Sequence, residues 1–496
     1  MENGILVDAG DATQGKSLAT CTQGNALIEL MNSAGYSLSI FGNHEFDYGM
    51  DQLLKNIENA KFTFLAANVR KDNGDLLLKT EEENGGYKII EVEGKKIGFF
   101  GISTTETAYK TNPNNVKGIK FEPEIESTQK VADELNGLGC DYVVGLMHVG
   151  IDKESNPKST DIADAVTGVD VIIDGHSHSD LQYESKNGTK VVQAGTQIKK
   201  LGQITVTFAQ DETKVETKLV TDEEFKKYGK KEEVESLYQK FTKELDEIYA
   251  EVVGNTATDI IANEVTDTGK VKRLVRNRET AIGDLVTDSM LWEAEKFLSK
   301  SEFKDLPLVA MTNGGGLRDD LKAGDITVGE VFAVTPYSMT LVVKEVTPNV
   351  LYEALESSIS CLTLNENNEV SGYSGGFPQV SGMRYEMDLT KKAYEEGVCK
   401  GEKVVAVYYT NKDGKEQLLD RNDTTTKIAL AANNFIYAGG DGYSMLSGMK
   451  PIVEGNVMDE ILADYITKLT EESENGSFTY VMDGNRSVEI NSKKNK

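Results

Sequence analysis

The four histidines of this 496-residue chain all lie in three short glycine-containing motifs, and a fourth motif of the same kind carries aspartates. The motifs are D-A-G-D-A-T-Q-G (8–15), G-N-H-E-F-D (42–47), M-H-V-G (147–150) and G-H-S-H (175–178). Imidazole nitrogens together with carboxylate and carboxamide oxygens suit Zn, Mn, Fe or Ni better than Mg or Ca. No cysteine lies near these motifs, which argues against a structural Cys–His zinc site. The residue types therefore favour a transition-metal centre.

Each motif follows a short apolar segment that we expect to form a strand. Over the first 220 residues or so, expected strands alternate with amphipathic segments of helical period, which predicts an α/β domain. The expected strands are 5–7, 38–41, 62–66, 96–101, 142–147, 169–173 and 190–194, and the expected helices are 24–33, 50–59 and 124–138. Because active sites of open α/β sheets gather outside the carboxyl ends of strands, the four motifs could converge on one point.

A structural explanation competes with this one for each histidine taken alone. A single histidine beside glycine is more often a turn residue or a buried histidine whose hydrogen bonds are satisfied. All four histidines follow strand ends, and this joint placement favours the metal centre. In an extended segment residues i and i+2 face the same side, so His176 and His178 could each reach one of two neighbouring cations.

The composition of the chain changes after residue 221. Residues 222–251 are dense in Glu and Lys and carry apolar residues at helical spacing, which predicts a connecting segment that is mostly one long helix, with Gly229 as a break. We therefore expect a metal-binding domain at 1–221, a connecting helix and hinge at 222–252, and a second mixed domain at 253–490. Helices of the second domain are expected near 282–298, 348–358 and 459–471.

The overall charge argues against a nucleic-acid binder. The chain has 53 Lys and Arg against 81 Asp and Glu, a net charge of −28, whereas such binders are normally basic over the contacting face. No apolar run approaches the ~18 residues of a membrane span, and the first residues do not form a signal peptide. No partner protein is implied. We expect the four cysteines to be small buried side chains, with Cys361 and Cys399 as the one pair that could bridge.

The second domain carries three features that could bind a ligand. A basic cluster at 270–278 could meet phosphates, or could be the solvated start of a helix. Asn313-Gly-Gly-Gly-Leu-Arg318 is a turn whose backbone could approach a ligand closely, with Arg318 as a forked donor. Tyr337 and Phe435 lie beside turn residues, where an aromatic ring is more often part of the core than a stacking platform.

The ordered set of motifs at 10–15, 42–45, 148 and 175–178 resembles the calcineurin-like metallophosphoesterases. The second domain narrows the resemblance to the 5′-nucleotidase/UDP-sugar hydrolase family, over essentially the whole chain. This resemblance implies a layered α/β/β/α metallophosphoesterase domain joined by a long helix to a mixed α/β substrate-binding domain. It also implies metal-dependent hydrolysis of nucleoside 5′-monophosphates by in-line attack of a metal-activated water, and an extracellular or cell-surface location.

The resemblance also implies roles for individual residues. Two divalent transition metal ions (Zn, Mn, Fe or Ni) would be held by Asp11, which bridges them, with Asn43, His148 and His176 on one ion and His178 on the other. His44 would face the phosphate, oriented by Asp47, as electrostatic stabiliser and proton donor. The nucleotide substrate would be bound by Arg276, Asn313 and Arg318 on its phosphate or ribose side, by Tyr337 and Phe435 around the base, by Asp441 at a ribose hydroxyl, and by Gly375 in the pocket wall.

The sequence departs from the family pattern at its start. The family begins with a strand ending in D-x-H that supplies an Asp and a His to the first metal, whereas only four residues precede the first expected strand here. We therefore expect Met1 to be an internal methionine of a longer protein, with an export signal upstream. The alternatives are a UDP-sugar or 2′,3′-cyclic nucleotide hydrolase, and an inactive nucleotide-binding surface protein with a decayed metal centre.

Overall fold

The computed structural model describes residues 4–80, 84–112, 114–152, 155–209, 213–265 and 271–491. Met1 and Lys270, to which the sequence analysis refers, lie outside these ranges. The chain divides into two compact units, Met1–Glu244 and Leu245–Lys496. The boundary between them falls within helix α7 (Glu232–Tyr249).

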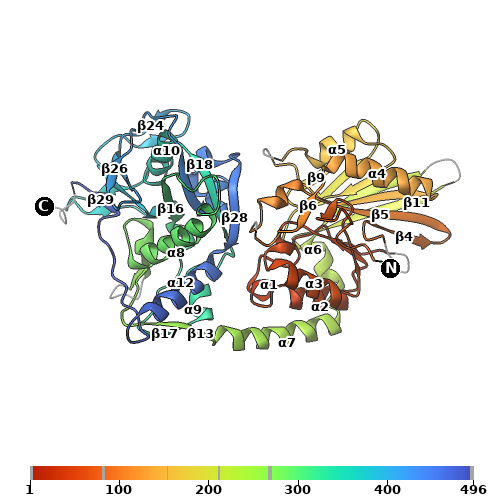
Figure 1. The fold of residues 1–496 in the computed structure, drawn as a ribbon, viewed down its shortest axis with the longest axis horizontal. Helices are drawn as coiled ribbons and strands as arrows, with labels where there is room; N and C mark the ends of the chain where they lie inside the picture. The colour runs from red at the N-terminus through yellow and green to blue at the C-terminus, as the bar shows by residue number, and fades with distance from the viewer. Residues whose placement is uncertain are drawn as a thin grey trace. The chain divides into compact units, whose positions relative to one another are not determined.

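The first unit is built around a six-stranded sheet in the order β4-β5-β7-β8-β10-β9 (Figure 1). Its strands are β4 (Tyr87–Val92), β5 (Lys95–Ser103), β7 (Tyr142–His148), β8 (Val171–Ile173), β9 (Asp180–Glu184) and β10 (Lys190–Ala194). The four strands β5, β7, β8 and β10 run parallel, so their carboxyl ends share one edge of the sheet. Every residue of β7 is buried, as its unbroken apolar sequence predicts for a central parallel strand.

Four layers make up this unit. The parallel pair β1 (Leu38–Ile40) and β2 (Thr63–Leu65) packs on one face of the large sheet through a shared apolar core. Helices α2 (Asn25–Ala34) and α3 (Gly49–Asn59) cover the outer side of that pair. Helices α4 (Glu124–Gly137) and α5 (Ser159–Ala165) cover the opposite face of the large sheet. The predicted α/β/β/α arrangement is confirmed.

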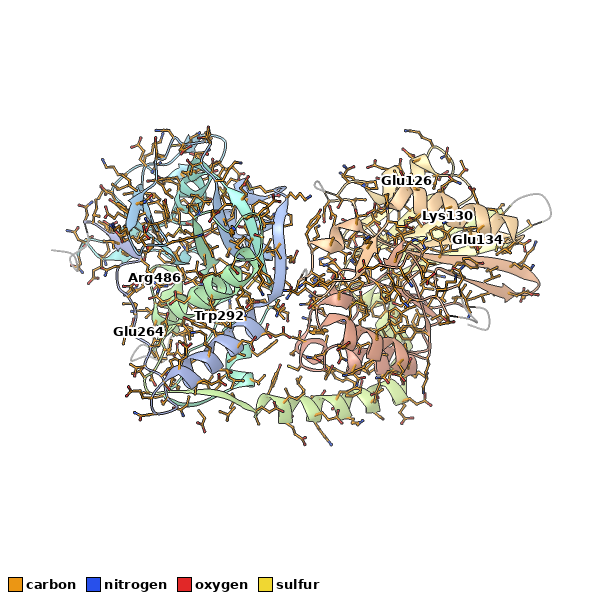
Figure 2. All side chains as sticks on the ribbon, viewed as in Figure 1. Glu126, Lys130, Glu134, Glu264, Trp292 and Arg486 are labelled. Atoms are coloured by element: carbon orange, nitrogen blue, oxygen red, sulfur yellow. The ribbon has the colours of Figure 1, made fainter. Side chains whose placement is uncertain are left out.

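Helix α4 shows why the layers form. Val131 and Leu135 are buried against the sheet, whereas Glu126, Lys130 and Glu134 lie four residues apart along the exposed face of the helix (Figure 2). Further elements of this unit are α1 (Ser17–Cys21), β3 (Val69–Lys71), β6 (Ile119–Phe121), the hairpin β11 (Lys200–Phe208) and β12 (Thr213–Thr221), and α6 (Asp222–Phe225).

The strand expected at 5–7 is reduced to a single bridge between Val7 and Leu38. The helix expected over 222–251 is divided, because Gly229 adopts φ 77° between α6 and α7. The expectation of four buried thiols is wrong: all four cysteines are free, Cys361 is exposed and the others are half-buried. Cys21 ends α1, Cys140 and Cys361 each lie three residues beyond the end of a helix, and Cys399 lies in a short two-stranded hairpin. No helix in the described ranges is both long enough and apolar enough to span a membrane.

The second unit has a five-stranded sheet in the order β21-β16-β27-β18-β28. These strands are β16 (Leu308–Asn313), β18 (Thr340–Val346), β21 (Pro378–Ser381), β27 (Ile428–Asn433) and β28 (Pro451–Val457). Helices α8 (Ala281–Leu298) and α12 (Met458–Glu472) pack on one face, and α10 (Pro348–Ser358) and α11 (Asn434–Tyr437) on the other. Alternation along β27 fits this sandwich: Ala431 belongs to the core of the first face and Leu430 to that of the second.

A second sheet of this unit, in the order β26-β25-β22-β29, packs on the core beneath α10. It consists of β22 (Met383–Met387), β25 (Val404–Thr410), β26 (Glu416–Leu418) and β29 (Ser487–Glu489). Further elements are β13 (Val252–Thr256), β14 (Asn263–Val265), β15 (Val271–Arg273), β17 (Gly324–Thr327), α9 (Val328–Val334), β19 (Thr363–Leu364), β20 (Val370–Ser371), β23 (Tyr394–Glu395) and β24 (Cys399–Lys400).

An ionic network ties the C-terminal segment to α8. Arg486, labelled in Figure 2, donates from Nη1 and Nη2 to the two oxygens of Asp288 at 2.7 and 3.1 Å. The backbone N–H of Asp483 donates to Oδ2 of Asp284 at 3.0 Å. Burial raises the pKa of Asp284 to about 8, with Glu279 adding to the rise and Arg486 opposing it.

This raised pKa predicts a stability that falls with pH. Between about pH 4 and pH 8 the folded chain keeps a proton on Asp284 that the unfolded chain loses, so folding becomes less favourable as pH rises through this window. Asp284→Asn is neutral at every pH and should gain about 1–3 kcal/mol over the wild type between pH 5 and pH 9. Urea unfolding at several pH values measures this gain, and parallel stability curves for the two proteins would contradict it.

Candidate active site

Asp11, His148 and His176 offer three ligand atoms that lie within 4.8 Å of one another. His148 is the last residue of β7, and His176 follows the neighbouring parallel strand β8. Asp11 follows Val7, which bridges to β1. The structure thus brings together three of the residues that the sequence singled out, one from the last position of β7 and two from loops at the carboxyl edge of the sheets.

Asp11 is held in place by its backbone. It adopts the left-handed φ of 62°, and its N–H donates to Oε2 of the buried Glu45 at 2.7 Å. The same oxygen accepts the N–H of Gly42 at 2.7 Å. A Cβ at Gly42 would lie 2.1 Å from Oδ1 of Asp11, so only glycine fits there. Glu45 was given no role from the sequence, although a glutamate inside a G-N-H-E motif could have been interpreted as a residue that anchors the loop.

The two buried histidines differ in pKa because of their neighbours. Nδ1 of His148 lies 2.7 Å from the carbonyl oxygen of Ala9, which directs Nε2 to within 2.9 Å of Oδ2 of Asp11. Burial lowers the pKa of His148, but the Asp11 carboxylate outweighs burial and raises it to about 9. Burial and the Lys110 ammonium lower the pKa of His176 to about 3. Burial works against ionisation of Asp11, yet His148 and His44 hold its pKa below the usual range.

The side chain of Asn43 shows that a cation fits beside the candidate ligands. Its side chain is 2% exposed, and Nδ2 donates to the carbonyl oxygen of Lys110 at 2.7 Å. Oδ1 is buried and makes no hydrogen bond within the part of the chain that the structure describes. A buried carbonyl oxygen without a partner is costly, and a bound cation would satisfy it. The carboxylate and imidazole donors of Asp11, His148 and His176 suit the same kind of ion.

His44 and Asp47 form an oriented pair. Nδ1 of His44 lies 2.7 Å from Oδ2 of Asp47, and Oδ1 of Asp47 accepts the Thr111 hydroxyl at 2.8 Å. The backbone N–H of His44 donates to Oδ1 of Asp11 at 2.9 Å, so the pair sits beside the candidate metal ligands. His178 is not part of the close group, although the Asp11 carboxylate acts on its pKa, which burial lowers.

In the second unit, the ends of the parallel strands β16 and β27 bring another predicted group together. Asn433 donates to Oδ1 of Asn313 at 2.9 Å, and Nδ2 of Asn313 donates to Oδ2 of Asp441 at 2.8 Å. The backbone N–H of Gly315 donates to the carbonyl oxygen of Gly375 at 2.7 Å. Asn313, Gly375 and Asp441 therefore line one corner of the unit.

The predicted arginines and rings complete this corner. The guanidinium of Arg318 lies 5.7 Å from the centre of the Tyr337 ring, whose residue is 52% exposed, and Phe435 is 43% exposed. Nε of Arg276 is buried without a hydrogen-bond partner among the described residues. Large rings left this open are available for stacking.

Arg273 is a third cation in this group that the sequence analysis did not assign. Its Nη1 donates to the carbonyl oxygen of Arg318 at 3.1 Å. Burial, with Arg318 and Arg276 nearby, lowers its pKa. Three guanidinium groups gathered in a chain of net charge −28 form a local attraction for an anion.

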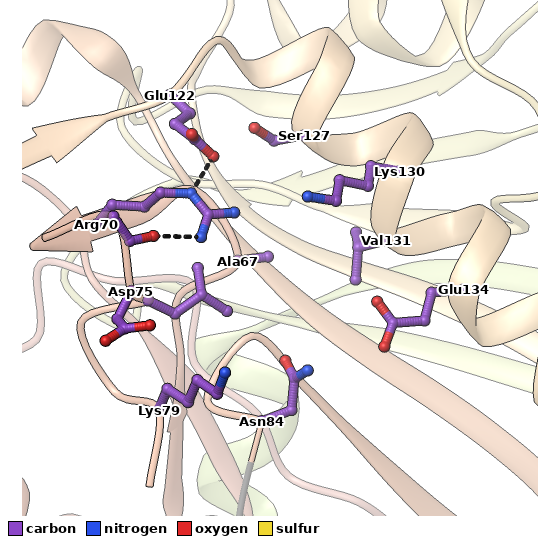
Figure 3. Close-up of a pocket in the computed structure, with 12 residues that line it drawn as sticks. Ala67, Arg70, Asp75, Lys79, Asn84, Glu122, Ser127, Lys130, Val131 and Glu134 are labelled. Atoms are coloured by element: carbon purple, nitrogen blue, oxygen red, sulfur yellow. Dashed lines mark hydrogen bonds and ion pairs between the residues drawn. The ribbon is translucent and has the colours of Figure 1, made fainter.

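A separate pocket of about 190 Å³ lies beside α4 in the first unit (Figure 3). Arg70, Lys79, Lys130 and Glu134 are among its walls, and none of the predicted site residues is. Arg70 pairs with Glu122 and donates to the carbonyl oxygen of Gly74, as the dashed lines show. The charge of Arg70 is thus paired within the pocket wall, and the pocket gives no indication of a catalytic site.

Comparison with known proteins follows the same division of the chain. Residues 2–180 match the family model of the calcineurin-like phosphoesterases, and residues 252–448 match that of the 5′-nucleotidase C-terminal domain. A trifunctional nucleotide phosphoesterase of Bacillus subtilis is 29% identical over 94% of the chain, which spans only 32% of that longer protein. A snake venom 5′-nucleotidase of Naja atra is 29% identical over 94% of the chain and 87% of its own length.

Solved structures agree on the fold. The NAD nucleotidase of Haemophilus influenzae superposes with a TM-score of 0.68 at 22% identity, covering 98% of this chain and 90% of that one. The 5′-nucleotidase precursor of Thermus thermophilus superposes with a TM-score of 0.50 at 27% identity, covering 99% and 90%. A calcineurin-like phosphoesterase domain implies divalent metal ions. The chain therefore belongs to the 5′-nucleotidase family of phosphoester hydrolases, with a calcineurin-like phosphoesterase domain followed by a 5′-nucleotidase C-terminal domain.

Proposed function

We propose that the chain hydrolyses nucleoside 5′-monophosphates to nucleoside and phosphate with the help of two divalent transition metal ions. The observation that carries this proposal is the group of Asp11, His148 and His176 beside Asn43, whose buried Oδ1 lacks a partner among the described residues. Relatives named 5′-nucleotidase support it. Relatives that include venom proteins also support an extracellular or cell-surface location.

The residues of the first unit would divide the work as follows. Asn43, His148 and His176 would hold one ion, His178 the other, and Asp11 both. When bound, two such ions activate a water molecule and neutralise charge on the phosphoryl oxygens. His44, oriented by Asp47, would face the phosphate, stabilise its developing charge and hold a proton for the leaving oxygen.

The residues of the second unit would select the substrate. Tyr337 and Phe435 would stack on the base, and Asp441 would accept a hydrogen bond from a ribose hydroxyl. Arg276, Arg318 and Asn313 would bind the phosphate or ribose side, beside the wall that contains Gly375. The exposure of the two rings and the unpartnered Nε of Arg276 support this assignment.

Phe435→Ala should separate base recognition from phosphate chemistry. Stacking of one base is worth about 1–3 kcal/mol, so KM for AMP should rise by about 5- to 150-fold while kcat changes little. Ribose 5-phosphate has no base, and its KM should stay within about twofold. Phe435→Tyr keeps the ring and should restore KM for AMP. An equal effect on both substrates would refute stacking at this position.

The direct test of the function is phosphate release from AMP by the metal-stripped protein after addition of Mn²⁺ or Zn²⁺. Turnover that depends on the added metal supports the proposal. Faster turnover of UDP-glucose or a 2′,3′-cyclic nucleotide would shift the assignment to those substrates. Binding of adenosine with no turnover of any of these would overturn the assignment as an enzyme.

A further inference from the structure

Two of the candidate metal ligands, His176 and His178, belong to one short loop, residues 174–179, which we call the histidine loop. Both histidines have a left-handed backbone, with φ of 73° and 53°. Residues other than glycine rarely adopt this conformation, and they keep it only where the surrounding structure imposes it. The histidine loop therefore needs a partner elsewhere in the chain that holds its backbone.

The side chain of Gln193 is this partner. Gln193 lies in β10, which pairs with β8 just before the histidine loop, and it is 2% exposed. Its Nε2 donates to the carbonyl oxygen of Gly175 at 2.6 Å and to Oδ2 of Asp174 at 3.2 Å. Its Oε1 accepts the Ser177 hydroxyl at 3.1 Å and the backbone N–H of Ser179. Both donors and both acceptor positions of the amide are thus used, before, between and after the two histidines.

Asp174 extends the network to a third candidate ligand, His148. Oδ1 of Asp174 accepts the backbone N–H groups of Val149 and Gly150, the two residues that follow His148, at 3.1 Å each. Asp174 is 3% exposed, so these bonds are shielded from water. The segment after β7 and the histidine loop are therefore bonded to each other through Asp174, and Gln193 holds both the carboxylate of Asp174 and the loop.

We propose that Gln193 is a positioning residue, which fixes the histidine loop before a metal ion binds and so holds His176 and His178 where they can ligate it. The ligand atom of His176 already lies within 4.8 Å of those of Asp11 and His148. The amide hydrogen-bonds to no imidazole within the described ranges, so its effect passes through the backbone of the loop. A loop that is ordered during folding need not be ordered again when the ion binds, and this favours binding.

This inference rests on metal binding in the proposed function, and its test needs no nucleotide. Gln193→Met keeps the length of the side chain and removes all four hydrogen bonds. The affinity for Mn²⁺, measured by calorimetry on the metal-stripped protein, should fall by about 10- to 100-fold. Gln193→Glu puts an oxygen in place of Nε2, against the acceptors of Asp174 and Gly175, and should lose at least as much. Wild-type affinity in Gln193→Met would overturn the proposal.

Asn56→Leu is the matched control, because it removes another buried amide from the same unit. Asn56 is also 2% exposed. Its Nδ2 donates to the carbonyl oxygen of Gln23 at 2.9 Å and its Oδ1 accepts Nε2 of Gln52 at 3.0 Å, and neither partner belongs to the histidine loop. Asn56→Leu should lower the melting temperature without metal, as Gln193→Met should, but leave Mn²⁺ affinity within about twofold. Equal losses of affinity in the two variants would overturn the proposal.

Backbone signals of the histidines give a readout that does not depend on any variant folding. The chain has only four histidines, so a sample labelled with ¹⁵N-histidine gives four backbone amide signals. In the metal-free wild type, those of His176 and His178 should be single and sharp, because the loop is already fixed. Gln193→Met should broaden or split them and leave that of His44 unchanged. Broad signals in the metal-free wild type that sharpen only when Zn²⁺ is added would overturn the proposal, since the ion itself would then order the loop.

The same measurements separate this inference from the proposed function. Loss of Mn²⁺ affinity in Gln193→Met, in a protein whose wild type hydrolyses no AMP, would refute the proposed function alone. Wild-type Mn²⁺ affinity in Gln193→Met, in a protein whose wild type hydrolyses AMP, would refute the role of Gln193 alone.

Discussion

His44→Ala is expected to lower kcat for AMP by about 10²–10³-fold while Mn²⁺ affinity stays unchanged. The ring is oriented by a 2.7 Å contact from Nδ1 to Asp47, and Asp47 is itself fixed by Thr111. A hydrogen-bond donor that is already oriented toward the developing charge needs no reorganisation during the reaction. Loss of such a donor therefore lowers kcat. The measurement is steady-state kinetics together with metal content per chain.

Two further variants make this result specific to orientation. Thr111→Val removes the hydroxyl that holds Asp47 and keeps the shape of the side chain, so kcat should fall by a smaller factor, about 3- to 10-fold. Asp47→Asn keeps a hydrogen-bond partner for His44 but loses the charge. Its kcat should lie between those of Thr111→Val and His44→Ala. Loss of metal from His44→Ala would instead identify His44 as a ligand, contrary to the proposed role.

The candidate metal ligands and the pair of His44 and Asp47 were predictable because they lie in short motifs at the ends of strands. His44 and Asp47 lie three residues apart in one motif, and their side chains meet in the structure. His148 ends one buried parallel strand and His176 follows the neighbouring one, so the sheet itself brings them together. Gln193 and Lys110 could not be found in this way. Gln193 belongs to a strand outside the motifs. Lys110 meets His176 across 66 residues of sequence, from a segment with no glycine or histidine motif.

Strands were predicted best where burial requires an uninterrupted run of apolar residues. Expected strands 142–147 and 190–194 lie within or match β7 and β10, whose apolar runs are buried on both sides. The hairpin of β11 and β12 was not predicted: residues 204–208 alternate apolar and polar side chains as a strand does, but the exposed Gly202 and Gln203 interrupt that pattern just before them. The strand expected at 5–7 forms one bridge only, between Val7 and Leu38, through the bonds from Ser37 N–H to Leu6 and from Asp8 N–H to Leu38.

Asp11→Asn is expected to have the largest effect of any single change in the first unit. The carboxylate of Asp11 lies at the centre of the group: Oδ2 is 2.9 Å from Nε2 of His148, and Oδ1 accepts the N–H of His44. Asparagine can keep that N–H bond, so the loop should fold as before. Removal of the charge takes away the one ligand proposed to serve both ions.

Mn²⁺ affinity and kcat/KM for Asp11→Asn should each fall by at least about 10³-fold. This loss is larger than the roughly 10- to 100-fold expected when a residue that hydrogen-bonds to a metal ligand is removed and the ligand itself is kept. Asp8→Asn is the matched control three residues away. Asp8 accepts the N–H of Gly10 and the hydroxyl of Ser39, both at 2.9 Å, and asparagine can accept both. Its metal affinity should stay near that of the wild type. Equal losses in the two variants would mean that the loop's fold, and not a ligand charge at Asp11, controls metal binding.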